Sequence, residues 1–122
     1  MVCFDWIFPE SARTLAVMGA DILCHSANLV LPFCQKAMIT RSIENHVFTI
    51  TSNRVGSEIN GDLSLTFTGT SQITDPQGNI LAQANEVEEI LMAVDIDPTT
   101  ARNKTITEKN HLFDDRRKEF YE

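Results

Sequence analysis

The chain has 122 residues, 43% of them hydrophobic and 22% charged, and its formal net charge is −7 at pH 7. This length allows one domain, with the composition of a folded globular protein rather than a disordered one. The negative charge argues against binding to nucleic acid or to an anionic membrane surface. No apolar run reaches the roughly 20 residues of a membrane span, and the acidic residues near the start leave no recognisable signal peptide.

The first half of the chain predicts the order β-α-β-α. Residues 1–3 resemble the end of a strand. Residues 9–18 suit a helix opened by Pro9 and stopped by Gly19, because proline fits a first helical position and glycine a helix end. An apolar run at 21–25 indicates a buried strand. A loop at 28–33 then leads to an amphipathic helix at 35–46.

The second half is predicted to be mainly β. Residues 47–51 are rich in β-branched side chains, which favour strands. Apolar and polar residues alternate at 63–68, the pattern of a half-buried strand. The remaining expectations are a polar loop at 56–61, a strand at 72–74, a turn at 75–78, an antiparallel pair at 80–84 and 89–96, and a helix from about 97 to 109.

Together these elements predict an α/β fold with one mixed β-sheet and helices on one face. The other face would carry Leu63, Leu65 and Phe67, with nothing in the sequence to cover it. The three cysteines form no CxxC pair and no Cys/His metal spacing. We therefore expect a reducing, cytoplasmic location and neither metal nor cofactor. Cys24 and Cys34 are interpreted as packing residues.

Cys3 stands where an apolar strand end meets a helix. The positive end of a helix favours a thiolate, and this position presents a side chain as a nucleophile. The stretch Cys3-Phe4-Asp5-Trp6-Ile7-Phe8-Pro9-Glu10, with Arg13 after it, resembles the nucleophile segment of the nitrilase superfamily of carbon–nitrogen hydrolases. Further resemblances follow in family order at residues 19–23, 26–29, 41–45, 52–56, 67–78 and 114–117.

This resemblance implies that residues 1–122 form the carboxy-terminal half of a four-layer αββα sandwich, with the upstream half absent. It makes Cys3 the nucleophile of a Glu-Lys-Cys triad and the backbone N–H of Phe4 an oxyanion donor. The family's glutamate and lysine lie upstream of the cysteine, where this sequence has nothing to match them. The chain alone is therefore expected to be inactive.

Other residues near the cysteine admit two interpretations each. Asp5 and Glu10 are expected to fix the turn, with an ion pair of Glu10 to Arg13 or to a later arginine, or else to form a solvated helix start. Arg41 and Glu44 are spaced for a local salt bridge on one helix face. The resemblance adds a structural role for this pair near the site.

Two residues are expected to face a substrate. Relatives that hydrolyse N-carbamoyl amino acids carry arginine in the stretch of Trp6 and Ile7, so apolar residues there favour a small neutral nitrile or amide. Asn28 follows a strand end beside the nucleophile and lines the pocket, or is an ordinary turn asparagine.

Two functions compete. The first is a fragment of a thiol hydrolase acting on non-peptide carbon–nitrogen bonds through a covalent intermediate on Cys3. The second is an inactive remnant or interaction module that keeps the sheet and its dimer helices. In either case the expected partner is a second copy of the chain or the missing half. An unrelated α/β binding domain would require all the matches to be accidental.

Overall fold

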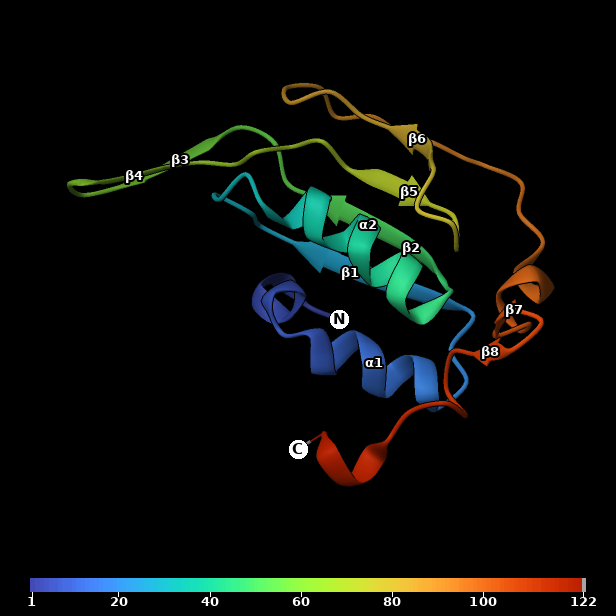
Figure 1. Ribbon diagram of the computed structural model, residues 1–122. Helices are drawn as coiled ribbons and strands as arrows, with labels where there is room; N and C mark the ends of the chain where they lie inside the picture. Colours follow the sequence, from blue (N-terminus) through green and yellow to red (C-terminus); the bar gives the residue numbers. More distant parts are fainter. Residues whose placement is uncertain (122) are drawn as a thin grey trace.

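A four-stranded mixed sheet forms the centre of the molecule (Figure 1). The computed structural model describes residues 1–121. The strands lie in the order β1 (Ile22–Ala27), β2 (Phe48–Asn53), β5 (Gln72–Thr74) and β6 (Ile80–Gln83). β1 and β2 are parallel and the other neighbours are antiparallel. The expected single mixed sheet is thus confirmed.

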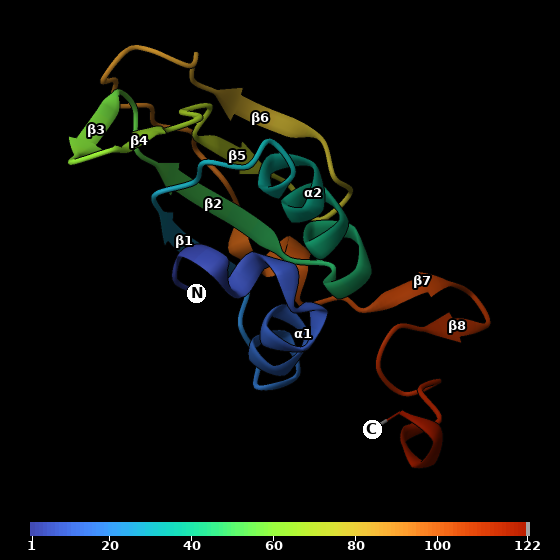
Figure 2. The same cartoon turned by 90° about the vertical axis from the view of Figure 1, so that its left-hand side faces the viewer.

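Two helices, α1 (Pro9–Val17) and α2 (Cys34–Asn45), pack on one face of this sheet (Figure 2). Pro9 opens α1 as expected, because a proline at this position loses no helical hydrogen bond. α2 ends at His46, which adopts the left-handed conformation that glycine usually supplies there. The face toward the helices carries Leu23 and His25 of β1 opposite Thr49 and Thr51 of β2.

The core between helices and sheet is apolar in two clusters and polar in a third. One apolar cluster groups Trp6, Leu29, Cys34 and Met38, and the other groups Ala12, Ala16, Leu23 and Val47. Between α2, β2 and β5, the hydroxyls of Ser42, Thr49 and Thr74 are fully buried and bond to one another. Burying a hydroxyl without a hydrogen-bond partner destabilises a fold, and here each of the three hydroxyls has a partner.

The other face of the sheet differs from the expectation. It carries a row of paired residues, Cys24, Ile50, Ile73 and Ala82, one from each strand. Leu63 and Leu65 lie instead in a separate hairpin of β3 (Ser57–Asn60) and β4 (Leu63–Thr66) that projects from the sheet. The expected polar loop at 56–61 is thus largely strand.

Phe67 also leaves the expected face. It is buried at the base of the hairpin, with the guanidinium of Arg54 4.2 Å from its ring centroid. An apolar ring that stacks under a cation gains a favourable contact while remaining out of water. The alternation at 63–68 therefore belongs to a strand of the hairpin and to Phe67 at its base, and not to a strand of the main sheet.

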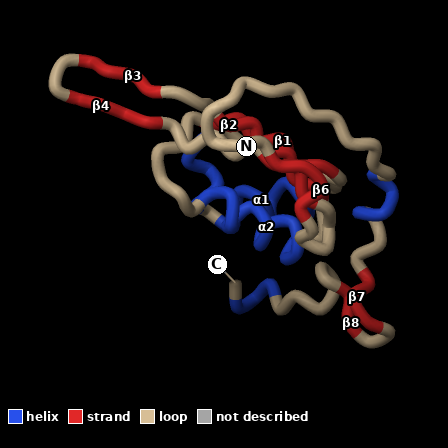
Figure 3. The backbone as a smooth tube through the Cα atoms, turned by 90° about the horizontal axis from the view of Figure 1, so that it is seen from above, coloured by secondary structure: helices blue, strands red, loops and turns tan. Residues whose placement is uncertain are grey.

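The chain after β6 departs from two further expectations. Residues 89–96 form no strand and arch over the side of the sheet away from the helices (Figure 3). The expected helix at 97–109 is only the 3₁₀ turn η2 (Pro98–Ala101), followed by the hairpin β7 (Thr105–Thr107) and β8 (Asn110–His111). Asp97 caps the turn as its sequence suggests. The side chain of Asn103 then bonds the N–H of Thr105, and β-branched residues continue as strand.

Candidate active site

Cys3 lies at a sharp turn where the chain leaves the sheet edge. Val2 pairs with Ser26 of β1 in a parallel bridge, and Cys3 follows with a φ of 43°. A non-glycine residue rarely adopts a positive φ, because its Cβ crowds the backbone. The Asp5 carboxylate holds the turn by accepting a hydrogen bond from the Val2 N–H at 2.8 Å, while the Asp5 N–H donates to the Val2 carbonyl at 3.1 Å.

Cys3 lies where a strand end meets a helix, but the helix that begins there is a short 3₁₀ turn and not α1. A 3₁₀ turn, η1 (Cys3–Ile7), separates the cysteine from α1, so Cys3 is the first residue of η1 rather than a neighbour of Pro9. Phe4 follows with an exposed ring packed edge-on against Trp6 and Phe8. Among residues 1–121 no hydrogen-bond acceptor for the Phe4 N–H is found, which leaves this donor free.

Trp6 and Arg41 tie the turn to α2. Trp6 is only 5% exposed and packs in one cluster with Leu29 and Met38, so its side chain supports the turn from the core. Arg41 donates to the Trp6 carbonyl at 3.4 Å and forms the expected salt bridge with Glu44 at 3.0 Å. This pair therefore connects the α2 surface to the backbone of the turn.

Glu10 and Arg13 do not form the expected ion pair. The Arg13 guanidinium donates to the backbone carbonyl of Glu44 and lies 5.4 Å from the ring centroid of Phe113. Glu10 is exposed in the first turn of α1, where its negative charge suits the helix dipole. The interpretation as a solvated helix start fits Glu10 better.

Asn28 is exposed just beyond the end of β1. Because Val2 runs parallel to Ser26, Asn28 and Cys3 follow neighbouring strands at the same sheet edge. The next residue, Leu29, is fixed by Asn53, whose amide oxygen accepts from the Leu29 N–H at 2.8 Å and whose amide nitrogen donates to Gly69. Sequence reasoning did not single out Asn53, although its place at a strand exit in the family-like segment was a usable signal.

His25 is a second residue that sequence reasoning treated as ordinary. Its ring lies under the turn, with Nε2 2.8 Å from the Cys3 carbonyl oxygen, and it is 2% exposed. Burial lowers the pKa of His25, and the hydrogen bond to Cys3 opposes this only in part. Leu23 and His25 are two residues apart on a buried strand, and this alternation was the signal in the sequence from which both could be placed on the same face.

The other two cysteines differ from each other. Cys34 is fully buried, and desolvation raises its pKa to about 12, as suits a packing residue. Cys24 is exposed on the sheet face away from the helices, contrary to its expected packing role. Among residues 1–121 no cluster of His, Cys, Asp and Glu side chains is arranged to hold a metal ion. No helix in the same range is both long and apolar enough to cross a membrane.

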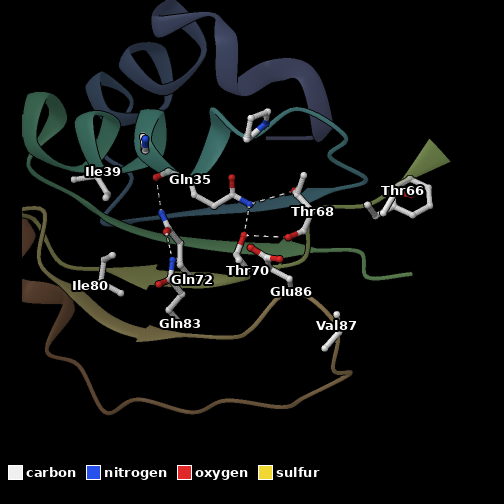
Figure 4. Close-up of a pocket in the computed structure, with 13 residues that line it drawn as sticks. Gln35, Ile39, Thr66, Thr68, Thr70, Gln72, Ile80, Gln83, Glu86 and Val87 are labelled. Atoms are coloured by element: carbon white, nitrogen blue, oxygen red, sulfur yellow. Dashed lines mark hydrogen bonds between the residues drawn. The ribbon is translucent and has the colours of Figure 1, made fainter. Parts of the chain in front are cut away.

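One hollow of the molecule lies away from Cys3. It has a volume of about 670 Å³ and opens between α2, the base of the β3–β4 hairpin and β6 (Figure 4). Two amide side chains at its wall are hydrogen-bonded: the Gln72 side chain donates to the Gln35 backbone carbonyl at 2.8 Å, and the Gln35 side chain donates to the Thr70 hydroxyl at 2.6 Å. None of the candidate site residues lines this hollow.

The fold and the turn define a class of protein, an α/β half-sandwich that presents a thiol at the exit of a strand. The model of the carbon–nitrogen hydrolase family matches residues 1–106, and the chain belongs to this family. The resemblance seen in the sequence is thereby confirmed.

Two relatives show how much of the family's length is present. A nitrilase of Pyrococcus abyssi is 49% identical over 121 residues, which are 99% of this chain and 45% of that protein. The 2-oxoglutaramate amidase of Bacillus subtilis is 35% identical over 125 residues, again 99% of this chain and 45% of its own length. The chain thus spans about half the length of these relatives.

Solved structures agree with the fold. A carbon–nitrogen hydrolase from Helicobacter pylori superposes with a TM-score of 0.80 at 28% identity, over 99% of this chain and 46% of the other. A mutant amidase from Nesterenkonia sp. AN1 superposes with a TM-score of 0.76 at 25% identity, over 98% and 41% of the two chains. That amidase carries a covalent acetamide group, derived from fluoroacetamide, at its active-site cysteine.

Proposed function

We propose that this chain is the nucleophile-bearing half of a thiol hydrolase that cleaves non-peptide carbon–nitrogen bonds. The observation that carries the proposal is the turn at Cys3, a strained thiol position held by Asp5 beside a free backbone N–H at Phe4. Strain at a non-glycine residue persists only where the surrounding contacts impose it, and it is concentrated at functional sites.

In this mechanism the Cys3 thiolate attacks the carbon of a nitrile or amide and forms a C–S bond. The electron pair released from the multiple bond is stabilised by the Phe4 N–H. With an amide, ammonia or an amine leaves after taking a proton, and an acyl-enzyme remains. Water then cleaves the C–S bond, which releases the acid and restores the thiol. A nitrile first gives a thioimidate. One water adds to its carbon and ammonia leaves, which gives the same acyl-enzyme, and a second water then releases the acid.

The proposed substrate is a small neutral nitrile or amide. The exposed Ile7 in the nucleophile segment offers no cation for a substrate carboxylate, and Asn28 at the same sheet edge supplies a neutral polar group. The relatives named as a nitrilase and an amidase act on these two bond types. We propose no cofactor, since thiol chemistry of this kind needs none.

A glutamate and a lysine are needed from outside this chain. Removing a single member of a catalytic unit already costs several orders of magnitude in rate. We therefore expect the 122 residues alone to release no ammonia from propionitrile or propionamide. Turnover by the isolated chain that is lost in Cys3→Ala would contradict this dependence on a second half.

Complementation tests the catalytic role directly. The chain is mixed with a fragment of the Pyrococcus abyssi nitrilase that contains the residues upstream of its own nucleophile segment, and ammonia release is followed. We expect turnover that Cys3→Ala abolishes and that the control Cys24→Ala retains. Turnover that survives Cys3→Ala would overturn the assignment of the nucleophile.

The alternative is an interaction module without turnover. The exposed apolar residues of the turn and of the loop before α2 favour it, because they suit a contact surface. Reading the coding sequence upstream of Met1 separates the two functions. An in-frame extension with the family's glutamate and lysine supports the enzyme, and a stop codon there supports the module. We place either form in the cytoplasm, on the strength of three unpaired cysteines.

A further inference from the structure

The ring of His25 makes a hydrogen bond whose direction is fixed by chemistry. Its Nε2 lies 2.8 Å from the carbonyl oxygen of Cys3. A carbonyl oxygen only accepts hydrogen bonds, so Nε2 carries a proton and donates. On a neutral ring Nδ1 is then an acceptor, and it faces the Thr51 hydroxyl at 3.5 Å and the Cys34 sulfur at 4.0 Å.

Burial keeps this ring neutral. His25 is 2% exposed, and desolvation lowers its pKa, so the Nε2–H tautomer persists at neutral pH. The ring is also held on its other side by β2, because His25 and Thr51 are register partners in the parallel pair. His25 therefore presents one donor at a fixed place beneath the turn.

The Cys3 carbonyl and the Phe4 N–H belong to the same peptide unit. A trans peptide is planar, so fixing the oxygen fixes the direction in which the N–H points on the opposite side. No cis peptide bond occurs within residues 1–121. Donation to the oxygen also polarises the amide and strengthens its N–H as a donor. The strained φ of 43° at Cys3 makes such an external restraint necessary.

We propose that His25 is a positioning residue, which orients the Cys3–Phe4 peptide so that the Phe4 N–H points at the oxyanion formed on the substrate. The inference rests on the proposed function of Cys3 and Phe4 and adds a third residue to it. His25 touches no reacting atom; it acts through the peptide plane.

The first experiment observes the peptide directly. Amide ¹H and ¹⁵N resonances of Phe4 are compared in the wild-type chain, His25→Leu and His25→Gln. Glutamine keeps an amide donor at about the reach of Nε2, and leucine removes it. We expect the Phe4 resonance to move in His25→Leu and to return toward the wild-type position in His25→Gln.

A matched variant controls for general repacking. Thr51→Val removes the partner of Nδ1 and leaves Nε2 in place, so it should leave Phe4 near its wild-type position. Should His25→Leu not fold, His25→Asn replaces it, since the shorter amide does not reach the Cys3 oxygen. The inference is overturned if the Phe4 resonance does not move in His25→Leu, or if it moves as far in His25→Gln as in His25→Leu.

The second experiment measures the oxyanion donor itself with two thiol probes. The Cys3 thiolate adds to butyraldehyde: sulfur bonds to the carbonyl carbon, and the electron pair of the C=O bond moves onto the oxygen, which becomes the oxyanion of a thiohemiacetal. Iodoacetamide alkylates the same sulfur without forming an oxyanion. Because one such donor is worth about 100-fold or more in rate, we expect His25→Leu to weaken aldehyde binding roughly tenfold more than it slows alkylation. His25→Gln should recover most of this loss.

The two possible failures differ in this experiment. Equal aldehyde affinity in the wild-type chain and His25→Leu overturns the role of His25 and leaves the proposed function standing. If Cys3 of the wild-type chain is alkylated but binds no aldehyde, the proposed oxyanion site is contradicted. The Phe4 resonance then still tests whether His25 orients the Cys3–Phe4 peptide.

Discussion

At the scale of single residues, the turn at Cys3 depends on one carboxylate. A left-handed φ costs a non-glycine residue roughly 1–2 kcal/mol. Two hydrogen bonds between Val2 and Asp5 offset this cost, one to the Asp5 carboxylate and one between backbone groups. Asp5→Ala should therefore lower the free energy of unfolding by about 1 kcal/mol, the usual loss for a cap. Urea denaturation measures it. The control Asp62→Ala, in an exposed turn, should change little, and an equal loss in both variants would contradict the role of Asp5.

The buried histidine also sets a pH dependence of stability. Desolvation lowers the pKa of His25 in the folded chain below the ordinary value of 6.5, so below that value the unfolded chain binds more protons than the folded chain. Stability should therefore fall as pH decreases from about 7.5 through the ordinary histidine range near 6.5. Melting temperatures across this range test the effect.

His25→Gln removes the titrating group and should flatten that profile. The pKa of His46 is lowered for the same main reason, so His46→Gln should flatten it further. A profile whose slope is the same in wild type and both variants would assign the pH dependence to other groups.

The three thiols should react in a definite order. We expect Cys3, as the proposed nucleophile, to be alkylated before Cys24, and Cys34 to remain unlabelled until the chain unfolds. Cys34 is 0% exposed and its pKa is about 12, so it has almost no thiolate at pH 8. Iodoacetamide labelling read by peptide mass checks this order. Faster labelling of exposed Cys24 would speak against the assignment of Cys3.

At the scale of elements, local patterns predicted those parts of the chain whose partners are near in sequence. Residues 9–18 and 35–46 are helical almost to the expected ends, because an apolar stripe and a terminating residue are both local signals. Residues 89–96 have the composition of a strand but no partner within residues 1–121. Strand pairing depends on a second segment, so alternation alone did not distinguish a hairpin arm, an arch and a sheet strand.

Gly69 tests how closely the base of the β3–β4 hairpin packs against the backbone at Glu86. A Cβ at Gly69 would lie 2.6 Å from the backbone oxygen of Glu86, whereas one at Gly56 meets nothing within 4 Å. Both glycines have positive φ, 55° and 84°, so alanine is strained at either position. Gly69→Ala should therefore destabilise the chain more than Gly56→Ala, in a comparison of urea midpoints. Equal losses would show that the backbone at Glu86 yields easily.

At the scale of the whole molecule, the site joins residues that are distant in sequence. The nucleophile segment was visible in the sequence because Cys3, Phe4 and Asp5 are contiguous. The contributions of His25 and Asn53 were not, since each acts through a hydrogen bond to a backbone group 22 or 24 residues away. Trp6 is the converse case. Its place in the motif suggested substrate contact, but its side chain is buried in the core.

The sheet face away from the helices should drive association. The row Cys24, Ile50, Ile73 and Ala82 crosses all four strands, and the arch beyond it exposes Leu91 at 95%. Ile50, Ile73 and Ala82 are half-buried, so covering each of them gains part of the roughly 1.5–3 kcal/mol that complete burial of a large apolar side chain is worth. We therefore expect the isolated chain to self-associate at micromolar concentration or to need the second half to stay in solution.

Sedimentation equilibrium of matched variants decides where this association arises. Ile73→Thr changes the open face and keeps a β-branched residue in the strand, so it should weaken association. Ile59→Thr makes the same change on the projecting hairpin, where the side chain is 76% exposed, and should leave association as it is. If Ile59→Thr had the larger effect, the contact would lie on the hairpin. A wild-type monomer that melts cooperatively and binds no hydrophobic dye would show that the arch already covers the sheet. An uncovered apolar row would bind such a dye.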